Sequence, residues 1–572
     1  MTNINVSALN GRNGFVIQGT AQDGNLGDAV SGAGDINGDG LPDILVGARN
    51  VDLNGDNNSE GQFSVIFGSN DGFSGQIPVS DLNGDNGFLV NGISNQEQRL
   101  GIAVSGAGDV NGDGIDDIVI GANGTNSNSG SSYVIFGASE LDSVDLLALD
   151  GTNGFEAEGI AEGDLFGGAV SSAGDLNGDG IDDIAISANR VDANGNENAG
   201  ATYVIFGSDA EFPENVDLAL LDGTNGFAIS GANENDFSGV SLSSAGDING
   251  DEIDDLLIGA PQADPGATEN AGTTYVVFGR SGAFTPEIDL STIDNSSFGF
   301  TINGIATGDA SGIAVSAVGD VDNDGLADIG IGAFSADVGN TNAGQSYIIF
   351  GQEAGFSESV SLASLDGDNG FAINGAEVDN QLGAAISAAG DVNNDGIDDV
   401  IVSAVGAAEE AGTSYVIFGQ ENNTEFGATI ELEDLNPNQG FKIEGIIASD
   451  RSGESVSNLG DVNGDGIDDL LIGAPQASPN GVRDAGEAYV VFGRIENIGD
   501  VDNDGSYTDQ DAYLISRVAA GLDTEFAAYS GIDPLLVADV NSDGVISGLD
   551  ASFIFIEANG GDCGCFLPDI NQ

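Results

Sequence analysis

The chain has 572 residues, of which 94 are Asp or Glu and only 10 are Lys or Arg, so its formal net charge is −84. Nucleic acids and anionic membrane surfaces carry the same sign of charge and would be repelled, which excludes both as partners. Hydrophobic residues still make up 40% of the chain. They follow strand patterns, so the sequence predicts a folded protein rather than a disordered acidic tail.

Targeting signals give little information. No run of about 18 apolar residues is present, so no membrane span is predicted. The start of the chain, Met1-Thr-Asn-Ile-Asn-Val-Ser, lacks the basic residues and apolar core of a signal peptide. Cys563 and Cys565 are too close together for an easy disulfide. Weak calcium loops suit the millimolar calcium found outside cells. We therefore expect an extracellular or cell-surface location, reached by another export route or after removal of a leader.

In chain order, the first predicted element is a strand at residues 14–19, Gly-Phe-Val-Ile-Gln-Gly. A nine-residue segment then recurs seven times, with Asp109-Val-Asn-Gly-Asp-Gly-Ile-Asp-Asp117 as the typical copy. From Asp35 to Asp461 the copies start about 71 residues apart on average. A repeat of this length that holds several short strands favours a propeller or a stacked array.

Each nine-residue segment has the composition of a calcium loop. Oxygen-bearing side chains stand at positions 1, 3, 5 and 9, and glycine usually occupies position 6, where a side chain would hinder the turn. Calcium binds several oxygen ligands at roughly 2.3–2.6 Å, whereas magnesium prefers to keep its waters. The predicted metal-site residues of the seven loops, at positions 1, 3, 5, 7 and 9, are Asp35, Asn37, Asp39, Leu41, Asp43; Asp109, Asn111, Asp113, Ile115, Asp117; Asp175, Asn177, Asp179, Ile181, Asp183; Asp247, Asn249, Asp251, Ile253, Asp255; Asp320, Asp322, Asp324, Leu326, Asp328; Asp391, Asn393, Asp395, Ile397, Asp399; and Asp461, Asn463, Asp465, Ile467, Asp469.

The loops lead into strands rather than helices. A helix–loop–helix calcium site requires an acid at position 12. In this chain position 12 is always β-branched and apolar: Val46, Ile120, Ile186, Ile258, Ile331, Val402 or Ile472. The apolar stretch that follows each loop is too short for a helix. Each loop is therefore predicted to join two strands.

Four strand signals fall within each repeat. In the second copy they lie at residues 100–108, 118–122, 133–137 and 154–159. Four antiparallel strands make one propeller blade, with small residues on the crowded inner strand and phenylalanines between blades. The last repeat ends on a third strand, at residues 489–493, and lacks a fourth. The strand at 14–19 is therefore predicted to complete the seventh blade and to close the ring.

These features resemble a known family. Phe136-Gly137, Gly259-Ala-Pro261, Gly473-Ala-Pro475 and the Asp-x-Asn-x-Asp-Gly-x-x-Asp loops make residues 1–494 similar to the FG-GAP repeats of integrin α-subunit N-terminal domains and their bacterial relatives. The resemblance implies a seven-bladed β-propeller with a calcium loop between the first and second strands of each blade. Some copies depart from the pattern, since Arg49 and Asn123 stand where proline is expected. Glu252 replaces the loop glycine in the fourth copy, so that calcium site is expected to be the weakest.

After Arg494 the pattern changes to two loops of a different kind. Residues 500–511 and 539–550 have oxygens at positions 1, 3, 5, 9 and 12, and helical spacing follows each. Residues 495–560 resemble a dockerin, which implies a cohesin-like partner; the alternative is a calcium-stabilised cap or a dimerisation module. Residues 561–572 form a tail. The predicted metal-site residues are Asp500, Asp502, Asp504, Ser506 and Asp511, and Asp539, Asn541, Asp543, Val545 and Asp550.

The predicted fold is therefore mainly β: a seven-bladed propeller of four-stranded antiparallel blades at residues 1–494, plus a small α module with two EF-hand-like loops. The predicted cofactor is Ca²⁺, up to seven ions in the propeller and two in the C-terminal module. Most of this calcium is expected to be structural, because each loop gathers carboxylates that repel one another.

No enzyme is predicted. The chain has no His, Lys442 is its only lysine, and no Ser or Cys lies in a recognisable nucleophile setting. A glycosidase-like pair such as Asp116-Asp117 recurs in five loops, whereas an active site is expected once. The first hypothesis is a secreted recognition or adhesion protein that binds an extracellular protein or glycan through one propeller face, with adhesion implied by the resemblance. The alternative is a polysaccharide-binding or carbohydrate-active component of a cohesin–dockerin assembly.

Overall fold

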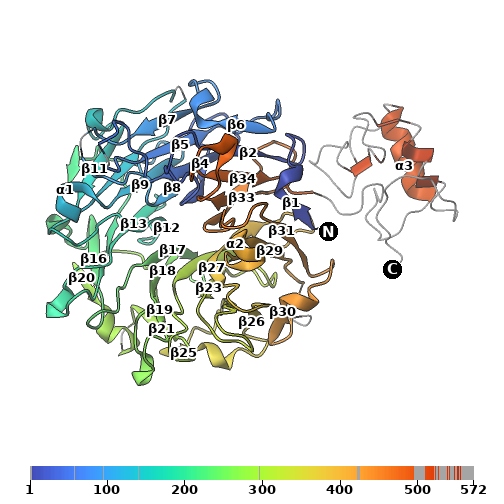
Figure 1. Ribbon diagram of the computed structural model, residues 1–572. Helices are drawn as coiled ribbons and strands as arrows, with labels where there is room; N and C mark the ends of the chain where they lie inside the picture. The colour runs from blue at the N-terminus through green and yellow to red at the C-terminus, as the bar shows by residue number, and fades with distance from the viewer. Residues whose placement is uncertain are drawn as a thin grey trace.

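The computed structural model of the chain describes residues 3–494, apart from Asn57, Asn95, Glu140, Ser296 and residues 422–425, together with residues 509–520 and shorter pieces between 522 and 555. Within this part of the chain, seven β-sheets follow one another around a ring (Figure 1). Each sheet is one blade of a β-propeller. The mainly β, seven-bladed architecture predicted from the sequence is confirmed. No helix among these residues is both long and apolar enough to cross a lipid bilayer.

Each blade contains four antiparallel strands, and the first strands of neighbouring blades contact one another around the ring axis. The second strands, such as β9 with the sequence Asp-Ile-Val-Ile-Gly-Ala, are buried along their whole length because a blade packs on either side. The strands of blades 1 to 7 are β3 (Val30–Gly34), β4 (Asp43–Ala48), β5 (Gln62–Ile66), β7 (Gly87–Asn91); β8 (Val104–Gly108), β9 (Asp117–Ala122), β10 (Ser131–Ile135), β11 (Gly154–Glu158); β12 (Val170–Gly174), β13 (Asp183–Ala188), β14 (Ala201–Ile205), β16 (Gly226–Ser230); β17 (Ser241–Gly246), β18 (Asp255–Ala260), β19 (Thr273–Val277), β21 (Gly299–Asn303); β22 (Ala314–Gly319), β23 (Asp328–Ala333), β24 (Gln345–Ile349), β26 (Gly370–Asn374); β27 (Leu382–Gly390), β28 (Asp399–Ala404), β29 (Thr413–Ile417), β31 (Gly440–Glu444); and β32 (Val456–Gly460), β33 (Asp469–Ala474), β34 (Glu487–Val491), β2 (Gly14–Gln18).

Six of the seven sheets also carry a short fifth strand, which corrects the prediction of four-stranded blades. This outer strand runs parallel to the fourth strand and, in five sheets, comes from the connection between the third and fourth strands of the next blade. In blade 3, for example, Ile288 of the next blade lies opposite Ile229. The sequence signal for it was weak because each such strand is only two or three residues long. The outer strands are β6 (Gln76–Pro78), β15 (Asn215–Val216), β20 (Glu287–Asp289), β25 (Ser359–Ser361), β30 (Thr429–Glu431) and β1 (Ile4–Asn5).

Short helical turns occupy the connections. One precedes the fourth strand of every blade: η1 (Val6–Ala8), η2 (Val79–Asp81), η3 (Leu146–Ala148), η5 (Leu218–Leu220), η7 (Leu290–Asn295), η8 (Leu362–Ser364) and η9 (Leu432–Asp434). The others lie between second and third strands: α1 (Thr125–Asn128), α2 (Ala407–Glu410), η4 (Ala193–Gly195), η6 (Pro265–Ala267) and η10 (Pro479–Gly481).

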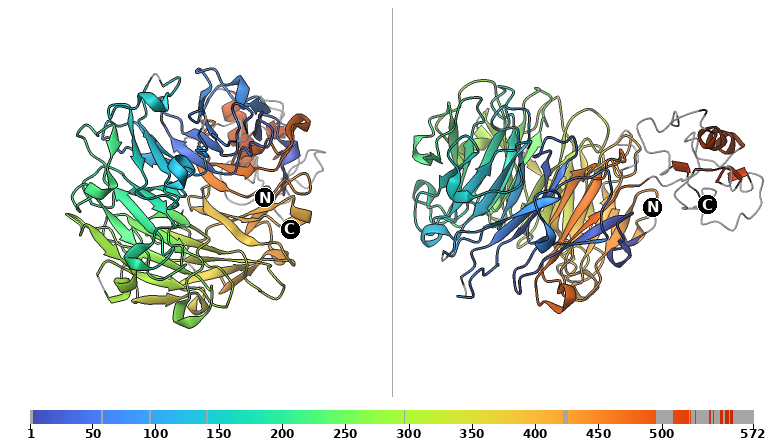
Figure 2. Two further views of the ribbon diagram at one scale, coloured as in Figure 1. Left: turned by 60° about the vertical axis from the view of Figure 1, so that its left-hand side comes forward. Right: turned by 90° about the horizontal axis from the view of Figure 1, so that it is seen from above.

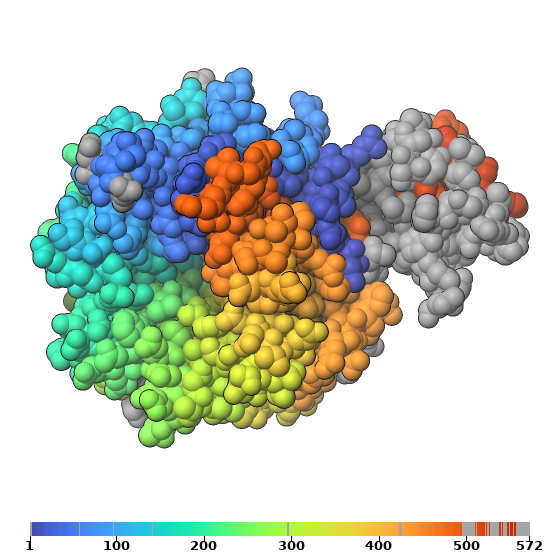
Figure 3. Space-filling view, in the orientation of Figure 1, coloured from blue at the N-terminus to red at the C-terminus, as the bar shows by residue number. Residues whose placement is uncertain are grey.

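The N-terminal segment closes the ring, as predicted. Strand β2 pairs antiparallel with β34, so Phe15 lies opposite Val490 and supplies the fourth strand of blade 7. Strand β1 pairs with β31 and adds the fifth strand of blade 6. In the views of Figure 2 the blue N-terminal strands lie among the orange strands of the last blades, and in Figure 3 the blue and orange surfaces meet. The first and last parts of the propeller are therefore held by two sets of strand pairs.

The hydrophobic core lies between blades. One buried cluster, for example, joins Val119 and Phe155 of blade 2 to Ile184 and Tyr203 of blade 3. Aromatic rings reinforce this joint, because Phe155 stacks on Phe212 of the next blade with ring centroids 4.7 Å apart. The same stack joins Phe15 to Phe73, Phe227 to Phe284, Phe300 to Phe356 and Phe371 to Phe426.

Beyond Arg494, helix α3 (Asp509–Ala519) lies where helical spacing was predicted. Its buried face, including Ile515, packs with Phe526, Val537 and Ile554. Ile467 of the blade 7 loop belongs to the same buried cluster and is only 1% exposed. The C-terminal segment therefore packs against the seventh nine-residue loop.

The seam of the ring can be tested with Phe15→Ala. Phe15 is fully buried and loses its contacts with Phe73 and Phe492 in the variant, so we expect a loss of about 3–5 kcal/mol of stability, measured by thermal and urea unfolding. Phe227→Ala is the matched control, since Phe227 occupies the same place in the continuous joint between blades 3 and 4. A Phe15→Ala variant as stable as the parent, beside a destabilised Phe227→Ala variant, would contradict a closed seam.

Candidate metal centre

The seven nine-residue loops lie at one end of the propeller. Each loop connects the first strand of a blade to the second, and in an antiparallel meander this end also carries the connections from third to fourth strands. We call this end the aspartate face and the other end, which carries the second-to-third connections and the connections between blades, the opposite face. Loop positions 1 to 9 are counted from Asp35, Asp109, Asp175, Asp247, Asp320, Asp391 and Asp461.

The aspartate at position 1 folds the loop around its own carboxylate. In the first loop, Asp35 Oδ1 accepts the N–H of Asp39 at 3.0 Å, and Oδ2 accepts the N–H of Gly40 at 2.8 Å. The same two bonds form in all seven loops. Backbone donors thus fix the position-1 carboxylate at the inside of the loop, where a cation would lie.

The loop backbone turns through left-handed conformations at positions 4 and 6. In the first loop Gly38 has φ 71° and Gly40 has φ 93°. The requirement at position 4 was missed by the sequence analysis, although glycine or asparagine stands there in every copy. In the fourth loop Glu252 adopts φ 67°, which costs roughly 1–2 kcal/mol for a residue with a Cβ. This strain is the physical basis for expecting the fourth loop to be the weakest site.

The aspartate at position 9 is the buried anchor of each blade. Asp117 is fully buried, and its carboxylate accepts the N–H of Val110 at 3.0 Å and of Gly137 at 2.9 Å. Gly137 is the glycine of the Phe-Gly pair that ends the third strand, and the equivalent glycine makes the same bond in every blade. Burial raises the pKa of Asp117 to about 8, and the two backbone donors oppose that rise.

In six loops an asparagine at position 3 supports this anchor. Asn111 Nδ2, for example, donates to Asp117 Oδ1 at 3.4 Å, and equivalent bonds of 3.3–3.4 Å are made by Asn37, Asn177, Asn249, Asn393 and Asn463. At position 5, Asp113 Oδ1 accepts the N–H of Ile115 at 3.0 Å, so positions 5 and 7 are joined locally. Each carboxylate oxygen that accepts one such bond keeps a second lone pair for a cation.

The fifth loop differs because Asp322 occupies position 3. Oxygens of Asp320, Asp322 and Asp328 all lie within 4.8 Å of one another, and among the described residues this is the one acidic group so closely gathered. Asp322 is 4% exposed, and its Oδ1 has no hydrogen-bond partner. Burial, with help from Asp324 and Asp320, raises the pKa of Asp322 to about 6. Three converging carboxylates and an unsatisfied buried oxygen fit a hard divalent cation such as Ca²⁺.

The aspartate at position 8 forms a hydrogen bond to the preceding blade. Asp116 Oδ2 accepts the N–H of Asp35 in the preceding blade at 2.8 Å, and Asp182 does the same for Asp109 at 2.9 Å. Asp254, Asp398 and Asp468 repeat the bond, whereas Pro42 and Ala327 occupy this position in the other two blades. The two carboxylates of Asp116-Asp117 are therefore both engaged by backbone amides, which explains their recurrence in structural terms.

Most of the predicted C-terminal metal residues lie outside the described residues: Asp500, Asp502, Asp504, Ser506, Asp539, Asn541, Asp543 and Val545. Asp511 lies within α3. Asp550 is fully buried, and its Oδ2 accepts the N–H and O–H of Ser547 at 2.8 and 3.0 Å. These bonds cap the start of a helical segment.

On the opposite face, a cavity of about 250 Å³ opens at the channel mouth and is lined by the first strands of all seven blades. Its lining is mainly Ala, Val, Ile and Ser, and the charged exceptions are Asp28 of blade 1 and Glu454 of blade 7. Asp28 pairs with Arg49 at 2.9 Å, and Glu454 pairs with Arg451 at 2.7 Å. The mouth thus carries two ion pairs on the side where the ring closes.

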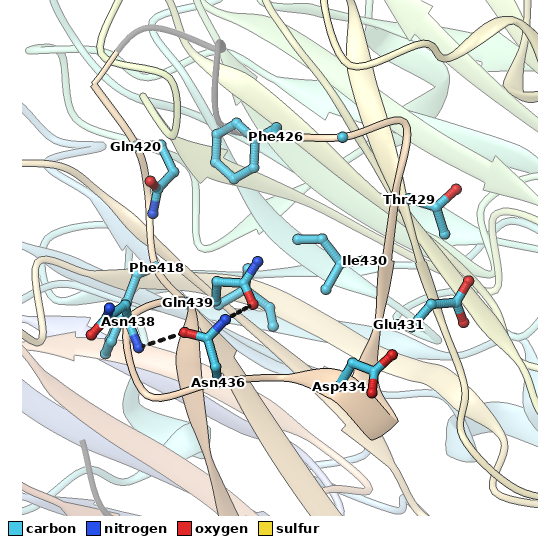
Figure 4. Close-up of a pocket in the computed structure, with 12 residues that line it drawn as sticks. Phe418, Gln420, Phe426, Thr429, Ile430, Glu431, Asp434, Asn436, Asn438 and Gln439 are labelled. Carbon is cyan, nitrogen blue, oxygen red and sulfur yellow. Dashed lines mark hydrogen bonds between the residues drawn. The ribbon is translucent and has the colours of Figure 1, made fainter. Parts of the chain in front are cut away.

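A larger pocket of about 480 Å³ lies at the edge of blade 6 (Figure 4). Asn436 accepts the N–H of Asn438 at 3.0 Å, and its amide also bonds Gln439. The Phe426 ring on its wall already stacks on Phe371, with centroids 4.5 Å apart. The aromatic face is therefore used in the joint between blades, and we assign no ligand to this pocket.

Comparison with known proteins agrees with this geometry. The FG-GAP repeat family matches residues 26–66, 100–135, 166–205, 238–277 and 452–491. The matches fall on blades 1–4 and 7, and each covers the region from the start of a blade through its loop to its third strand. The protein is thus a β-propeller in which five blades match the FG-GAP repeat, and it is similar to integrin α subunits. Integrin alpha-4 of Xenopus laevis is 32% identical over 183 residues, which cover 32% of this chain and 16% of that protein.

A second relative is phosphatidylinositol-glycan-specific phospholipase D of Homo sapiens, 27% identical over 425 residues that cover 70% of this chain and 47% of the relative. The chain therefore spans less than half the length of these two relatives. Among solved structures, a complex of the third cohesin of ScaC with the ScaB dockerin from Acetivibrio cellulolyticus shares 33% identity, covers 13% of this chain and 96% of the matched chain, and has a TM-score of 0.11. A TM-score this low carries no structural argument.

The ion pairs at the channel mouth predict a pH effect. Burial raises the pKa of Asp28 to about 6, with Glu454 adding to the rise and Arg49 and Arg451 opposing it. Because the folded pKa lies above the ordinary value of 3.8, the stability contributed by Asp28 is greatest below about pH 4 and is lost as the pH rises through about 6. We expect Asp28→Asn to remove about 1 kcal/mol of this change between about pH 5 and pH 7.

The measurement is urea unfolding at both pH values with calcium held constant. Asp71→Asn, which removes the same charge from an exposed loop residue, is the control and should keep the pH effect of the parent protein. An identical pH effect in Asp28→Asn and the parent would show that Asp28 does not titrate in this range.

Proposed function

We propose that the protein is a secreted recognition or adhesion protein whose propeller is stabilised by Ca²⁺ in the loops of the aspartate face. The observation that supports calcium best is the convergence of Asp320, Asp322 and Asp328 with one buried oxygen left without a partner. The other six loops share the same backbone arrangement around position 1 and would hold weaker ions. Two further ions are proposed for the C-terminal module, on the sequence of its loops alone.

The proposed ligand surface is the opposite face. Its connections differ in length and sequence from blade to blade, as residues 49–61 and 123–130 show, whereas the loops of the aspartate face are nearly identical. Its connections between blades also expose aliphatic side chains, including Ile160, Val378 and Ile447. Variable loops on a rigid scaffold are the usual place for recognition. Similarity to integrin alpha-4 supports recognition of an extracellular protein or glycan.

Catalysis is not part of the proposal. The chain contains no histidine, and the recurring aspartate pairs are engaged by backbone amides. Similarity to a phospholipase D makes a direct test of catalysis necessary.

The purified full chain should bind one or more members of an extracellular protein and glycan array in calcium, and it should release neither reducing sugars nor lipid-linked glycan products. Release of either product would contradict a recognition protein.

Removal of calcium should destabilise the propeller. In excess EDTA the position-1 and position-9 carboxylates would stay close together without a counter-charge, so we expect the Tm to fall and calcium to restore it. Each site contributes about 2.7 kcal/mol when free calcium is 100 times its Kd. Differential scanning calorimetry measures the shift, with magnesium as the control, which should restore less stability than calcium. A melting curve that is the same in EDTA and in calcium would remove the metal assignment.

A further inference from the structure

We infer that the fifth loop is the first calcium site to fill and the tightest of the seven, and that Asp322 is the residue that sets this order. The inference rests on the proposed calcium function and concerns how the sites differ from one another. It is carried by the contrast between one side chain in the fifth loop and its equivalents in the other six.

In the six loops with asparagine at position 3, the buried carboxylate has a side-chain hydrogen-bond donor even without a metal. The amide nitrogen at position 3 donates to the position-9 carboxylate, as Asn111 does to Asp117 at 3.4 Å and Asn463 does to Asp469 at 3.1 Å. A neutral donor next to a buried carboxylate offsets part of the cost of burying it. These loops therefore have a stable metal-free form that competes with calcium binding.

The fifth loop lacks this side-chain donor. Asp322 offers no N–H, so two acidic side chains, Asp322 and Asp328, face each other where an amide–carboxylate bond lies elsewhere. Asp328 is fully buried and Asp322 is 4% exposed, with Oδ1 unsatisfied. An unpaired buried anion destabilises the folded protein strongly. A divalent cation relieves that cost. Because the metal-free form of the fifth loop is less stable than that of the other loops, the fifth loop binds the cation more tightly.

The number of carboxylate ligands also favours tighter calcium binding by the fifth loop. At positions 1, 3 and 9 the fifth loop offers three carboxylates, against two carboxylates and one amide in the other six. Calcium affinity rises with the number of charged ligands. The position-6 glycine is also retained at Gly325, with φ 92°, so the fifth loop avoids the strain seen at Glu252 in the fourth. The predicted order of filling therefore starts with blade 5 and ends with blade 4.

The experiment exchanges the distinguishing residue in both directions. Asp322→Asn gives the fifth loop the residue that the other six carry, and Asn111→Asp gives the second loop the acid of the fifth. Calcium binding is followed by competition with a chromophoric chelator and by native mass spectrometry of the full chain at limiting calcium. Asp71→Asn, on an exposed loop, controls for the loss of one negative charge.

The parent protein should retain one propeller ion at calcium concentrations where the other six blade loops are empty, in addition to any ions of the C-terminal module, which is the same in every variant. In Asp322→Asn the affinity of this first step should fall about tenfold or more, while in Asn111→Asp a second tight ion should appear; Asp71→Asn should behave as the parent. An unchanged first step in Asp322→Asn, with calcium still bound, would overturn the proposed order alone. Absence of any calcium binding by the parent would overturn the proposed calcium function as well.

Discussion

The structure depends on one buried carboxylate per blade, the aspartate that ends each loop and begins the second strand. It accepts hydrogen bonds from the loop backbone and from the glycine that ends the third strand, as Asp117 does from Val110 and Gly137. A side chain at the start of each second strand thus ties the loop to the sheet. A buried anion is costly when it is not satisfied, so the same carboxylate that organises the blade also requires compensating positive charge nearby. The backbone donors, the position-3 asparagine and the proposed calcium ion all serve this requirement.

The blades are also joined by three repeated contacts. Phenylalanine stacks such as Phe155 on Phe212 bury apolar surface, position-8 aspartates such as Asp116 accept an N–H from the preceding blade, and short outer strands pair with the neighbouring sheet. Two joints depart from this pattern at the aspartate contact, where Pro42 and Ala327 stand. Pro42 stands at the joint between blades 7 and 1, and the pairing of β2 with β34 holds the two ends of the propeller together within blade 7.

Much of this fold could be read from the sequence, because the repeat places the same residue types at the same offsets. The loops, the four main strands and the use of the N-terminal strand in blade 7 all follow from local patterns. The outer strands could not be predicted, since their two or three residues carry no periodicity and pair with another blade. The role of Gly137 was also missed, because its N–H meets Asp117 from 20 residues away. The difference between Asp322 and the asparagines was visible in the sequence, but only the burial of Asp322 shows its importance.

Pairing of Phe15 with Val490 has a consequence for synthesis of the chain. The N-terminal strands leave the ribosome first, yet their partners are the last propeller residues to be made. At about 5–20 residues per second, the interval is roughly half a minute to a minute and a half. During that time β2 presents Phe15 and Ile17, both fully buried in the finished ring, to whatever surrounds the nascent chain. The ring can therefore close only after Glu487–Val491 have been made, and a chaperone that shields these few apolar side chains would act on a defined and short-lived target.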